Sequence, residues 1–171
     1  EHDDPEHIPP AFYIPVIPLV LVNGSRGIAT GWATTILPRS VDSIVAAVRE
    51  YITTGDIKKT KLEVDFPHFT GKVVDEGEGK FKVYGDVELK GKTGLLIKEV
   101  PYGYDREKYV AILNKLEDDG KIVSYDDLCD KNGFSFDVKL KRDYNATKAN
   151  ILKDFKMVLS LSENINVIGP D

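Results

Sequence analysis

Hydrophobic and polar positions repeat with two different periods along the chain, and each period predicts one type of element. Apolar residues recur every three or four positions over residues 41–53 and 106–118, which is the spacing of amphipathic helices. Ser40 precedes the first of these segments and is expected to cap its N-terminus. A third helix is expected over residues 146–155, and a short helical turn over residues 124–128. The first helix is predicted to pack inward through one stripe, made of Val41, Ile44, Val45, Val48, Tyr51 and Ile52.

Segments with the period of a β-strand fill the interval between the first two helices. Glycine-containing turns separate them and predict an antiparallel meander over about residues 60–100. The expected strands span residues 61–66, 71–75, 80–84, 86–90 and 94–100. Residues 134–141 alternate strictly between apolar and polar, as a half-buried strand does, and final strands are expected from residue 157 onwards. These elements predict an α/β (α+β) fold, with a mixed, mainly antiparallel sheet and helices packed against it.

Composition narrows the class of protein. The chain has 171 residues, 42% of them hydrophobic, which suffices for one domain with its own core, or for one domain with a small lobe. Its formal net charge is -5, whereas a free-standing nucleic-acid-binding domain is usually basic, so autonomous DNA binding is not expected. Cys129 is the only cysteine, so no disulfide framework is expected and a reducing, cytoplasmic setting fits.

Neither a metal site nor a membrane segment is expected. The three histidines, His2, His7 and His68, are too widely scattered to form a cluster of metal ligands. The most apolar run, residues 14–22, is too short to cross a bilayer and contains two prolines.

A glycine-rich loop holds the residues that point most clearly to a function. Residues 23–34 read Asn-Gly-Ser-Arg-Gly-Ile-Ala-Thr-Gly-Trp-Ala-Thr, with the bulky apolar Ile28 among small residues. Glycine lets another molecule approach the backbone closely, while Ser, Thr and Arg donate hydrogen bonds to phosphate and sugar oxygens. Such a loop suits a DNA minor groove, with Ile28 as a wedge between base pairs. The candidate DNA-binding residues are Asn23, Gly24, Ser25, Arg26, Gly27, Ile28 and Thr30. An ordinary turn is the other interpretation, because Asn-Gly is a common turn dipeptide and most glycine-rich connections have no function.

Residues 14–34 resemble the segment that follows the active-site tyrosine domain in type IIA DNA topoisomerases, both the eukaryotic enzymes and the gyrase A subunits. The resemblance covers about residues 8–171 and is strongest over residues 13–52. Further matching segments follow in gyrase-like order: Ile36-Leu-Pro-Arg-Ser40, Glu99-Val-Pro-Tyr102, Leu140-Lys-Arg-Asp143 and residues 157–168. The pair Gly31-Trp32 combined with Gly27-Ile-Ala29 is most similar to the branch of this family found in T-even-type phages.

This resemblance implies a division of the chain and a role for its residues. Residues 13–171 correspond to the tower domain, which grips the outer arms of the cleaved DNA, and residues 1–12 to a connector from the upstream tyrosine (winged-helix) domain. Ile28 corresponds to the isoleucine that intercalates and bends that DNA. Lys139, Lys141 and Arg142 are candidate contacts to an outer arm, although a solvated strand face explains them equally well.

The resemblance also implies that the chemistry lies outside this chain. The parent protein is expected to be a subunit of an ATP-dependent topoisomerase that pairs with a second copy and with a large subunit carrying the metal-binding and ATPase domains. Mg²⁺ and ATP are expected to act there, in the cytoplasm of a host cell if the protein is phage-encoded. The tyrosine nucleophile is expected upstream of Glu1, and the nearest lookalike, Tyr144, is assigned a structural role. The chain alone is therefore expected to be inactive.

Two other classes of function compete with this interpretation. One is a non-catalytic protein-interaction or dimerisation module, in which residues 13–34 form a structural strand and turn. The other, a nucleotide-hydrolysing enzyme, depends on Gly91-Lys92-Thr93 as the end of a phosphate-binding loop. That motif fails because Asp86 stands where its first glycine is required.

Overall fold

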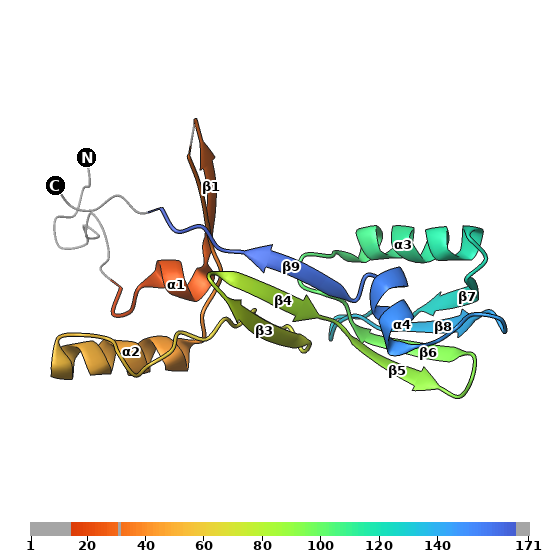
Figure 1. The fold of residues 1–171 in the computed structure, drawn as a ribbon, viewed down its shortest axis with the longest axis horizontal. Coiled ribbons are helices and arrows are strands. Elements are labelled where there is room, and N and C mark those ends of the chain that lie inside the picture. Colours follow the sequence, from red (N-terminus) through yellow and green to blue (C-terminus); the bar gives the residue numbers. More distant parts are fainter. Residues whose placement is uncertain (1–14, 31, 167–171) are drawn as a thin grey trace, which may run out of the picture.

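Three antiparallel sheets follow one another along an elongated molecule (Figure 1). The computed structural model describes residues 15–30 and 32–166. A two-stranded sheet pairs β1 (Ser25–Ala29) with β2 (Trp32–Ile36). The central sheet has the order β3 (Lys72–Gly77), β4 (Lys80–Tyr84), β9 (Val158–Ser162). The third sheet has the order β5 (Asp86–Lys90), β6 (Gly94–Glu99), β8 (Phe136–Leu140), β7 (Ile122–Asp127). With the helices below, these sheets confirm the predicted α+β class.

Side-chain caps mark the starts of three of the four described helices. The helices are α1 (Leu19–Asn23), α2 (Val41–Thr54), α3 (Arg106–Asp118) and α4 (Lys148–Asp154). The Ser40 hydroxyl group accepts the N–H of Ser43 at 3.2 Å, as predicted for the start of α2. The Asp105 carboxylate accepts the N–H of Lys108 at 2.8 Å at the start of α3. The sequence pattern therefore located α2, α3 and α4 to within a few residues, whereas α1 was not predicted.

The main hydrophobic core lies in what we call the distal lobe, the four-stranded sheet with α3 and α4 packed against it (Figure 1). Phe136, Val138 and Leu140 of β8 are all buried, which confirms the alternation predicted from the sequence. Tyr109 of α3 is fully buried, and its hydroxyl group donates to the Phe155 carbonyl oxygen at 2.8 Å, so the one polar atom of the ring is satisfied.

A smaller core stabilises the central sheet and joins it to the distal lobe. It consists of Leu37, Phe66, Phe81 and Val83. The Phe66 ring stacks on the Tyr102 ring with centroids 3.9 Å apart, and Tyr102 follows β6 of the distal lobe. The predicted meander is therefore divided between two sheets, since β3 and β4 belong to the central sheet and β5 and β6 to the distal lobe.

Two predicted elements are wrong. Residues 124–128 are not a helical turn, because residues 122–127 form β7 and pair with β8. The free edge of β8 offers backbone partners that outweigh the local helical signal of this segment. Residues 61–66 form no strand beyond a single bridge between Val64 and Arg39, because the segment runs beside residues 38–40 and ends with Phe66 in the smaller core.

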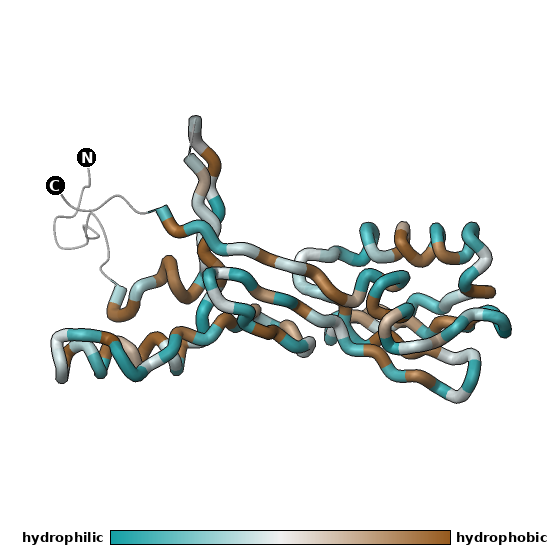
Figure 2. The backbone as a smooth tube through the Cα atoms, viewed as in Figure 1, coloured by the Kyte–Doolittle hydropathy of each residue, from teal (hydrophilic) through white to brown (hydrophobic). Residues whose placement is uncertain are grey.

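The predicted apolar stripe of α2 is buried only in part. Ile44 is buried and Val45 and Val48 are half-buried, but Val41 is 47%, Tyr51 58% and Ile52 77% exposed. The reason is that α2 projects away from the sheets and lies beside the short, mostly hydrophobic α1 (Figures 1 and 2). The predicted connector, residues 1–12, lies outside the described residues. The boundary of the tower domain at residue 13 stays a prediction.

Candidate nucleic-acid interface

The predicted glycine-rich loop is a β-hairpin that projects from the body of the molecule (Figure 1). Strands β1 and β2 pair in register from Ser25 opposite Ile36 to Ala29 opposite Trp32. Gly24 turns the chain from α1 into β1 with φ of 69°, and a Cβ atom there would lie 2.6 Å from the Ile36 carbonyl oxygen. Only glycine fits both the backbone conformation and the close approach, so Gly24 sets the direction of the hairpin.

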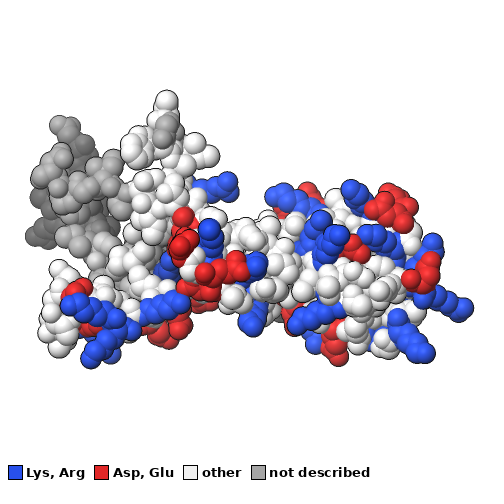
Figure 3. Space-filling model, viewed as in Figure 1, with Lys and Arg blue, Asp and Glu red and all other residues white. Residues whose placement is uncertain are grey.

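Ile28 lies near the tip of this hairpin and is 83% exposed. Its partner across the strands is Ala33, which is too small to cover it. Because opposed residues share a face and successive residues alternate between faces, Arg26 lies on the same face as Ile28. The visible face of the hairpin is largely uncharged in Figure 3. This face of the hairpin thus presents one large apolar side chain, Ile28, with one neighbouring cation, Arg26.

Trp32 is a surface feature of the hairpin that sequence reasoning missed as a site residue. It is 69% exposed and lies opposite Ala29, on the other face from Ile28. Two large apolar side chains therefore project from opposite faces of one narrow ribbon. The period of two along residues 25–29 and 32–36 would have revealed this arrangement if the segment had been interpreted as a hairpin.

The remaining candidate residues of the loop are spread along the hairpin from its base to its turn. Asn23 ends α1, Ser25 begins β1 and Thr30 lies in the turn, and all three are exposed. Gly27 differs from Gly24, because a Cβ atom there would make only ordinary contact, 3.7 Å from the Thr34 methyl group. The chain itself does not require glycine at position 27. The missing side chain instead leaves the backbone beside Ile28 open to another molecule.

Lys139, Lys141 and Arg142 are not brought together with the hairpin. Lys139 belongs to β8 of the distal lobe, the other two follow it, and all three are exposed. Figure 1 shows the distal lobe at the opposite end of the molecule from α2, and Figure 3 shows Lys and Arg side chains interspersed with Asp and Glu over it. Any ligand that contacts both Ile28 and these cations must therefore extend along the molecule.

Tyr144 is engaged in interactions within the distal lobe. Its hydroxyl group donates to one carboxylate oxygen of Asp154 at 3.0 Å, and Lys121 donates to the other at 2.9 Å. The hydrogen bond from Lys121 lowers the pKa of Asp154, and burial raises the pKa of Tyr144 above its usual value. A tyrosine that is harder to ionise and holds a structural carboxylate fits the structural role predicted for it.

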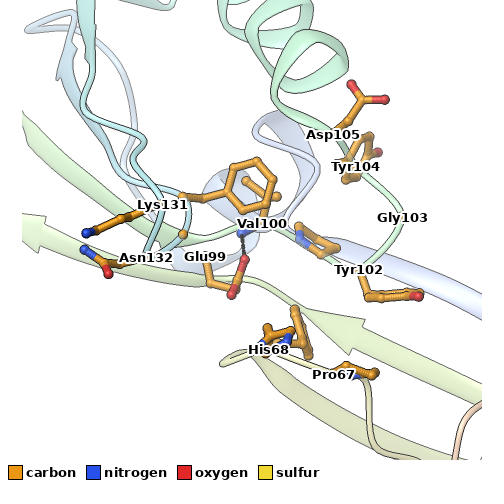
Figure 4. A pocket seen from close by; sticks show the side chains of 14 residues that line it. Pro67, His68, Glu99, Val100, Tyr102, Gly103, Tyr104, Asp105, Lys131 and Asn132 are labelled. Carbon is orange, nitrogen blue, oxygen red and sulfur yellow. Dashed lines mark hydrogen bonds between the residues drawn. The ribbon is translucent and has the colours of Figure 1, made fainter. Parts of the chain in front are cut away.

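A cavity of about 540 Å³ lies between the central sheet and the distal lobe (Figure 4). Glu99 is buried at its floor, where one carboxylate oxygen accepts the N–H of Val100 at 3.0 Å. The other oxygen accepts the hydroxyl group of Thr70 at 2.9 Å and its N–H at 3.2 Å. Both carboxylate oxygens accept hydrogen bonds from the chain itself, so Glu99 joins two segments of the structure and is assigned a structural role.

Two further features belong to the part of the chain that the structure describes. No group of three or more His, Cys, Asp or Glu side chains in it is arranged to hold a metal ion. None of the helices within residues 15–30 and 32–166 combines the length and apolar character needed to cross a membrane.

Comparison with known proteins identifies the family. The family model for the A subunits of DNA gyrase and topoisomerase IV matches residues 1–169. The DNA topoisomerase medium subunit of Enterobacteria phage T4 is 46% identical over 98% of this chain and 39% of its own length. The DNA topoisomerase 4 A subunit of Staphylococcus aureus is 29% identical over 89% of this chain and 22% of its own length. The chain thus spans well under half the length of these relatives.

A solved structure supports the same assignment at the level of the fold. The crystal structure of the Plasmodium falciparum topoisomerase II DNA-binding, cleavage and re-ligation domain superimposes with a TM-score of 0.80 and 27% identity. The superposition covers 91% of this chain and 22% of that one. The resemblance that began with the residues around Ile28 therefore extends through both the central sheet and the distal lobe. The chain belongs to the family of DNA gyrase and topoisomerase IV A subunits, and its fold is that of the type II topoisomerase DNA-binding and cleavage region.

Proposed function

We propose that this chain is the part of a type IIA topoisomerase subunit that binds and bends the DNA segment to be cleaved. Ile28 enters the minor groove and inserts between two base pairs, which supports double-strand breakage, passage and rejoining. One observation carries the proposal, namely an isoleucine that is 83% exposed near the tip of a projecting hairpin. Its place near the tip of a projecting hairpin, beside Arg26 and the open backbone at Gly27, suits insertion into a minor groove.

Burial of Ile28 would return a free energy of the same order as the cost of opening a base step. Unstacking one base step costs on the order of a few kcal/mol, and full burial of an isoleucine side chain returns about 1.5–3 kcal/mol. Any part of the unstacking cost that this burial does not offset is offset by the further protein–DNA contacts that the bend allows. Arg26 lies two residues from Ile28 on the same strand and face, about 7 Å away, and is placed to contact an adjacent phosphate. Asn23, Ser25 and Thr30, together with the open backbone at Gly27, supply neutral contacts to the sugar-phosphate backbone.

Because the chain is negatively charged, other parts of the enzyme must supply most of the electrostatic attraction to DNA. A net charge of -5 is unfavourable for independent DNA binding, so the main electrostatic attraction comes from other domains. We assign the nucleophilic tyrosine to a preceding domain, and the Mg²⁺ and ATP sites to a large partner subunit. A second copy of this subunit completes the enzyme, which acts in the cytoplasm. On this basis the chain alone neither cleaves DNA nor hydrolyses ATP.

Lys139, Lys141 and Arg142 are proposed as contacts to an outer arm of the bent DNA. Their place on the distal lobe supports this role, because a duplex bent at Ile28 and following the long axis of the molecule would reach them (Figures 1 and 3). Their contribution is expected to depend on salt concentration, since it rests on phosphate contacts alone.

A protein-interaction module is the second candidate function. Besides Ile28 and Trp32, the exposed apolar residues include Leu19 of α1 and Tyr51 and Ile52 of α2, which suits a surface that docks protein. The two functions differ in their response to salt. Affinity that rests on phosphate contacts falls steeply as the salt concentration rises, whereas docking through apolar surface does not.

Site-specific crosslinking tests which molecule covers Ile28. A photo-crosslinking phenylalanine analogue is placed at position 28 of the full-length protein, and at position 52 as a control with comparable exposure (77%). In the assembled enzyme with a duplex substrate, position 28 is expected to crosslink to DNA and position 52 is not. Crosslinking of position 28 to protein alone would instead establish the docking module.

A further inference from the structure

A two-stranded ribbon is marginally stable on its own, so something must hold the hairpin of β1 and β2 in place. The chain that follows β9 does this along the outer edge of β2. The N–H of Thr35 donates to the Asn164 carbonyl oxygen at 2.7 Å, and the N–H of Asn164 donates to the Thr35 carbonyl oxygen at 3.0 Å. This antiparallel bridge joins residues far apart in sequence and adds part of a third strand to the hairpin.

Two asparagine side chains extend this contact towards the tip. The side-chain amide of Asn164 donates to the Ala33 carbonyl oxygen at 2.9 Å, and that of Asn166 donates to the same oxygen at 2.5 Å. Ala33 is the residue directly opposite Ile28. We call Asn164 and Asn166 the asparagine clamp. Both side-chain amides therefore bond to the residue that lies directly across the hairpin from Ile28.

Thr34 adds a second point of attachment between the clamp and β2. Its hydroxyl group donates to the Asn164 carbonyl oxygen at 3.0 Å and accepts the N–H of Asn166 at 3.3 Å. Residues 33, 34 and 35 are thus each hydrogen-bonded to Asn164 or Asn166, so β2 is held along its length and not only at its base.

The clamp is itself fixed to the central sheet through Glu163. Its carboxylate receives two hydrogen bonds from the Arg39 guanidinium, at 2.9 and 2.6 Å, and one from the N–H of Leu37 at 2.7 Å. The side chains of this ion pair are only 9% and 6% exposed, and Arg39 also lies 5.8 Å from the centre of the Phe81 ring. The N–H of Glu163 donates to the Gly79 carbonyl oxygen at 2.7 Å. The clamp therefore begins at a buried residue that side-chain and backbone hydrogen bonds hold in place.

We propose that Asn164 and Asn166 are positioning residues, which hold β2 at the angle at which Ile28 enters the base stack. The inference rests on the proposed function of Ile28. A wedge on a freely swinging ribbon must be ordered when it binds, whereas a wedge held by the clamp is ordered when the protein folds. Both asparagines are exposed, so their side chains stabilise no core. Their contribution lies in the orientation of the hairpin.

The test replaces both side chains, Asn164→Ala with Asn166→Ala, in the full-length protein assembled with the subunits it needs to bind DNA. Asn132→Ala is the matched control, because Asn132 is an exposed asparagine whose amide bonds only to Asp130 within its own loop of the distal lobe. Two quantities are measured. One is amide hydrogen exchange of residues 25–29 and 32–36 without DNA, and the other is the ratio of bent to unbent duplex at saturating protein.

The clamp variant is expected to exchange the hairpin amides several-fold faster, while amides of α3 keep their rates. The bent-to-unbent ratio is expected to fall about tenfold, equivalent to about 1.4 kcal/mol, because insertion must then order the hairpin. The control variant is expected to change neither quantity. A parallel measurement on Ile28→Ala separates this proposal from the proposed function on which it rests.

Three results would overturn the proposal. Unchanged hairpin exchange in the clamp variant would show that the asparagines do not hold β2. Faster exchange with undiminished bending would show that the orientation of the hairpin is set by other contacts, and the wedge itself would stand if Ile28→Ala abolishes bending. Full bending by Ile28→Ala would remove the wedge and with it any positioning role, whatever the exchange rates show.

Discussion

Shortening the Ile28 side chain in steps is predicted to reduce DNA bending in proportion to the apolar surface removed. Ile28→Val removes one carbon atom and Ile28→Ala removes three. Each buried methylene contributes about 0.8 kcal/mol, and the 83% exposure of Ile28 makes nearly all of its side chain available for burial against bases. The expected losses are therefore about 0.7 kcal/mol for valine and about 2 kcal/mol for alanine. At 1.4 kcal/mol for each factor of ten, the bending equilibrium falls about 3-fold and about 30-fold.

The assay is fluorescence energy transfer between dyes at the two ends of a duplex, with the full-length, assembled protein at saturating concentration. Saturation separates bending from binding, so the ratio of bent to unbent duplex reports the wedge alone. Ile52→Ala is the matched control, because Ile52 is also strongly exposed (77%) but lies on α2. Folding stability should change by less than about 0.5 kcal/mol in all three variants, since each alters an exposed side chain. Equal bending by the Ile28 variants and the native protein, or equal losses from Ile28→Ala and Ile52→Ala, would refute the reasoning.

Three further predictions concern neighbouring groups. Replacing Arg26 with Gln is expected to lower the slope of log affinity against log salt by about 1, as measured by salt titration, because one phosphate contact is lost; an unchanged slope would remove Arg26 from the interface. Gly24→Ala is expected to destabilise the hairpin by more than about 1 kcal/mol in thermal or denaturant unfolding, because its φ is 69° and the Cβ atom would meet a backbone oxygen at 2.6 Å; native stability would contradict this geometry. Hydrogen bonds from Thr60, and then from the N–H groups of Lys58 and Lys59, lower the pKa of Glu50 from 4.5 to about 2. The stability that Glu50 gives to this loop is therefore complete above pH 4.5 and is lost as the pH falls towards 2. The protection of the loop amides, measured as the exchange rate relative to the intrinsic rate at each pH, should fall over that window in the native protein and stay constant in Glu50→Gln; equal pH dependence in the two proteins would contradict this role.

Much of the fold follows from local patterns in the sequence. Phe136, Val138 and Leu140 alternate with polar residues, and burial of that face alone determines which side of β8 meets the core. Ser40 and Asp105 mark the starts of α2 and α3 because a helix N-terminus needs hydrogen-bond acceptors nearby in sequence. Such features were predictable because their physical causes lie within a few residues.

Features that depend on distant partners could not be derived in this way. The ion pair of Arg39 and Glu163 joins residues 124 positions apart, and nothing near either residue predicts it. Tyr51 and Ile52 continue a helical apolar pattern, yet they are exposed because no described element covers the end of α2. Periodicity shows that a face is apolar, but only the tertiary structure shows what covers it.

The candidate site could be predicted from the sequence only in part. Ile28 was identifiable from the sequence because a bulky apolar residue among glycines and small polar residues is unusual in a surface turn. The hairpin that carries it was missed, since its glycines obscure the period of two, and Trp32 was missed with it. The asparagine clamp lay beyond sequence reasoning, because its acceptor at Ala33 is a backbone oxygen and leaves no trace in the sequence.

The decisive measurement is a structure of the full-length, assembled protein bound to a duplex. We predict that the Ile28 side chain lies between two adjacent base pairs at the bend, with Arg26 against a neighbouring phosphate. An unbroken base stack beside the hairpin, with Ile28 covered by another protein segment, would contradict it.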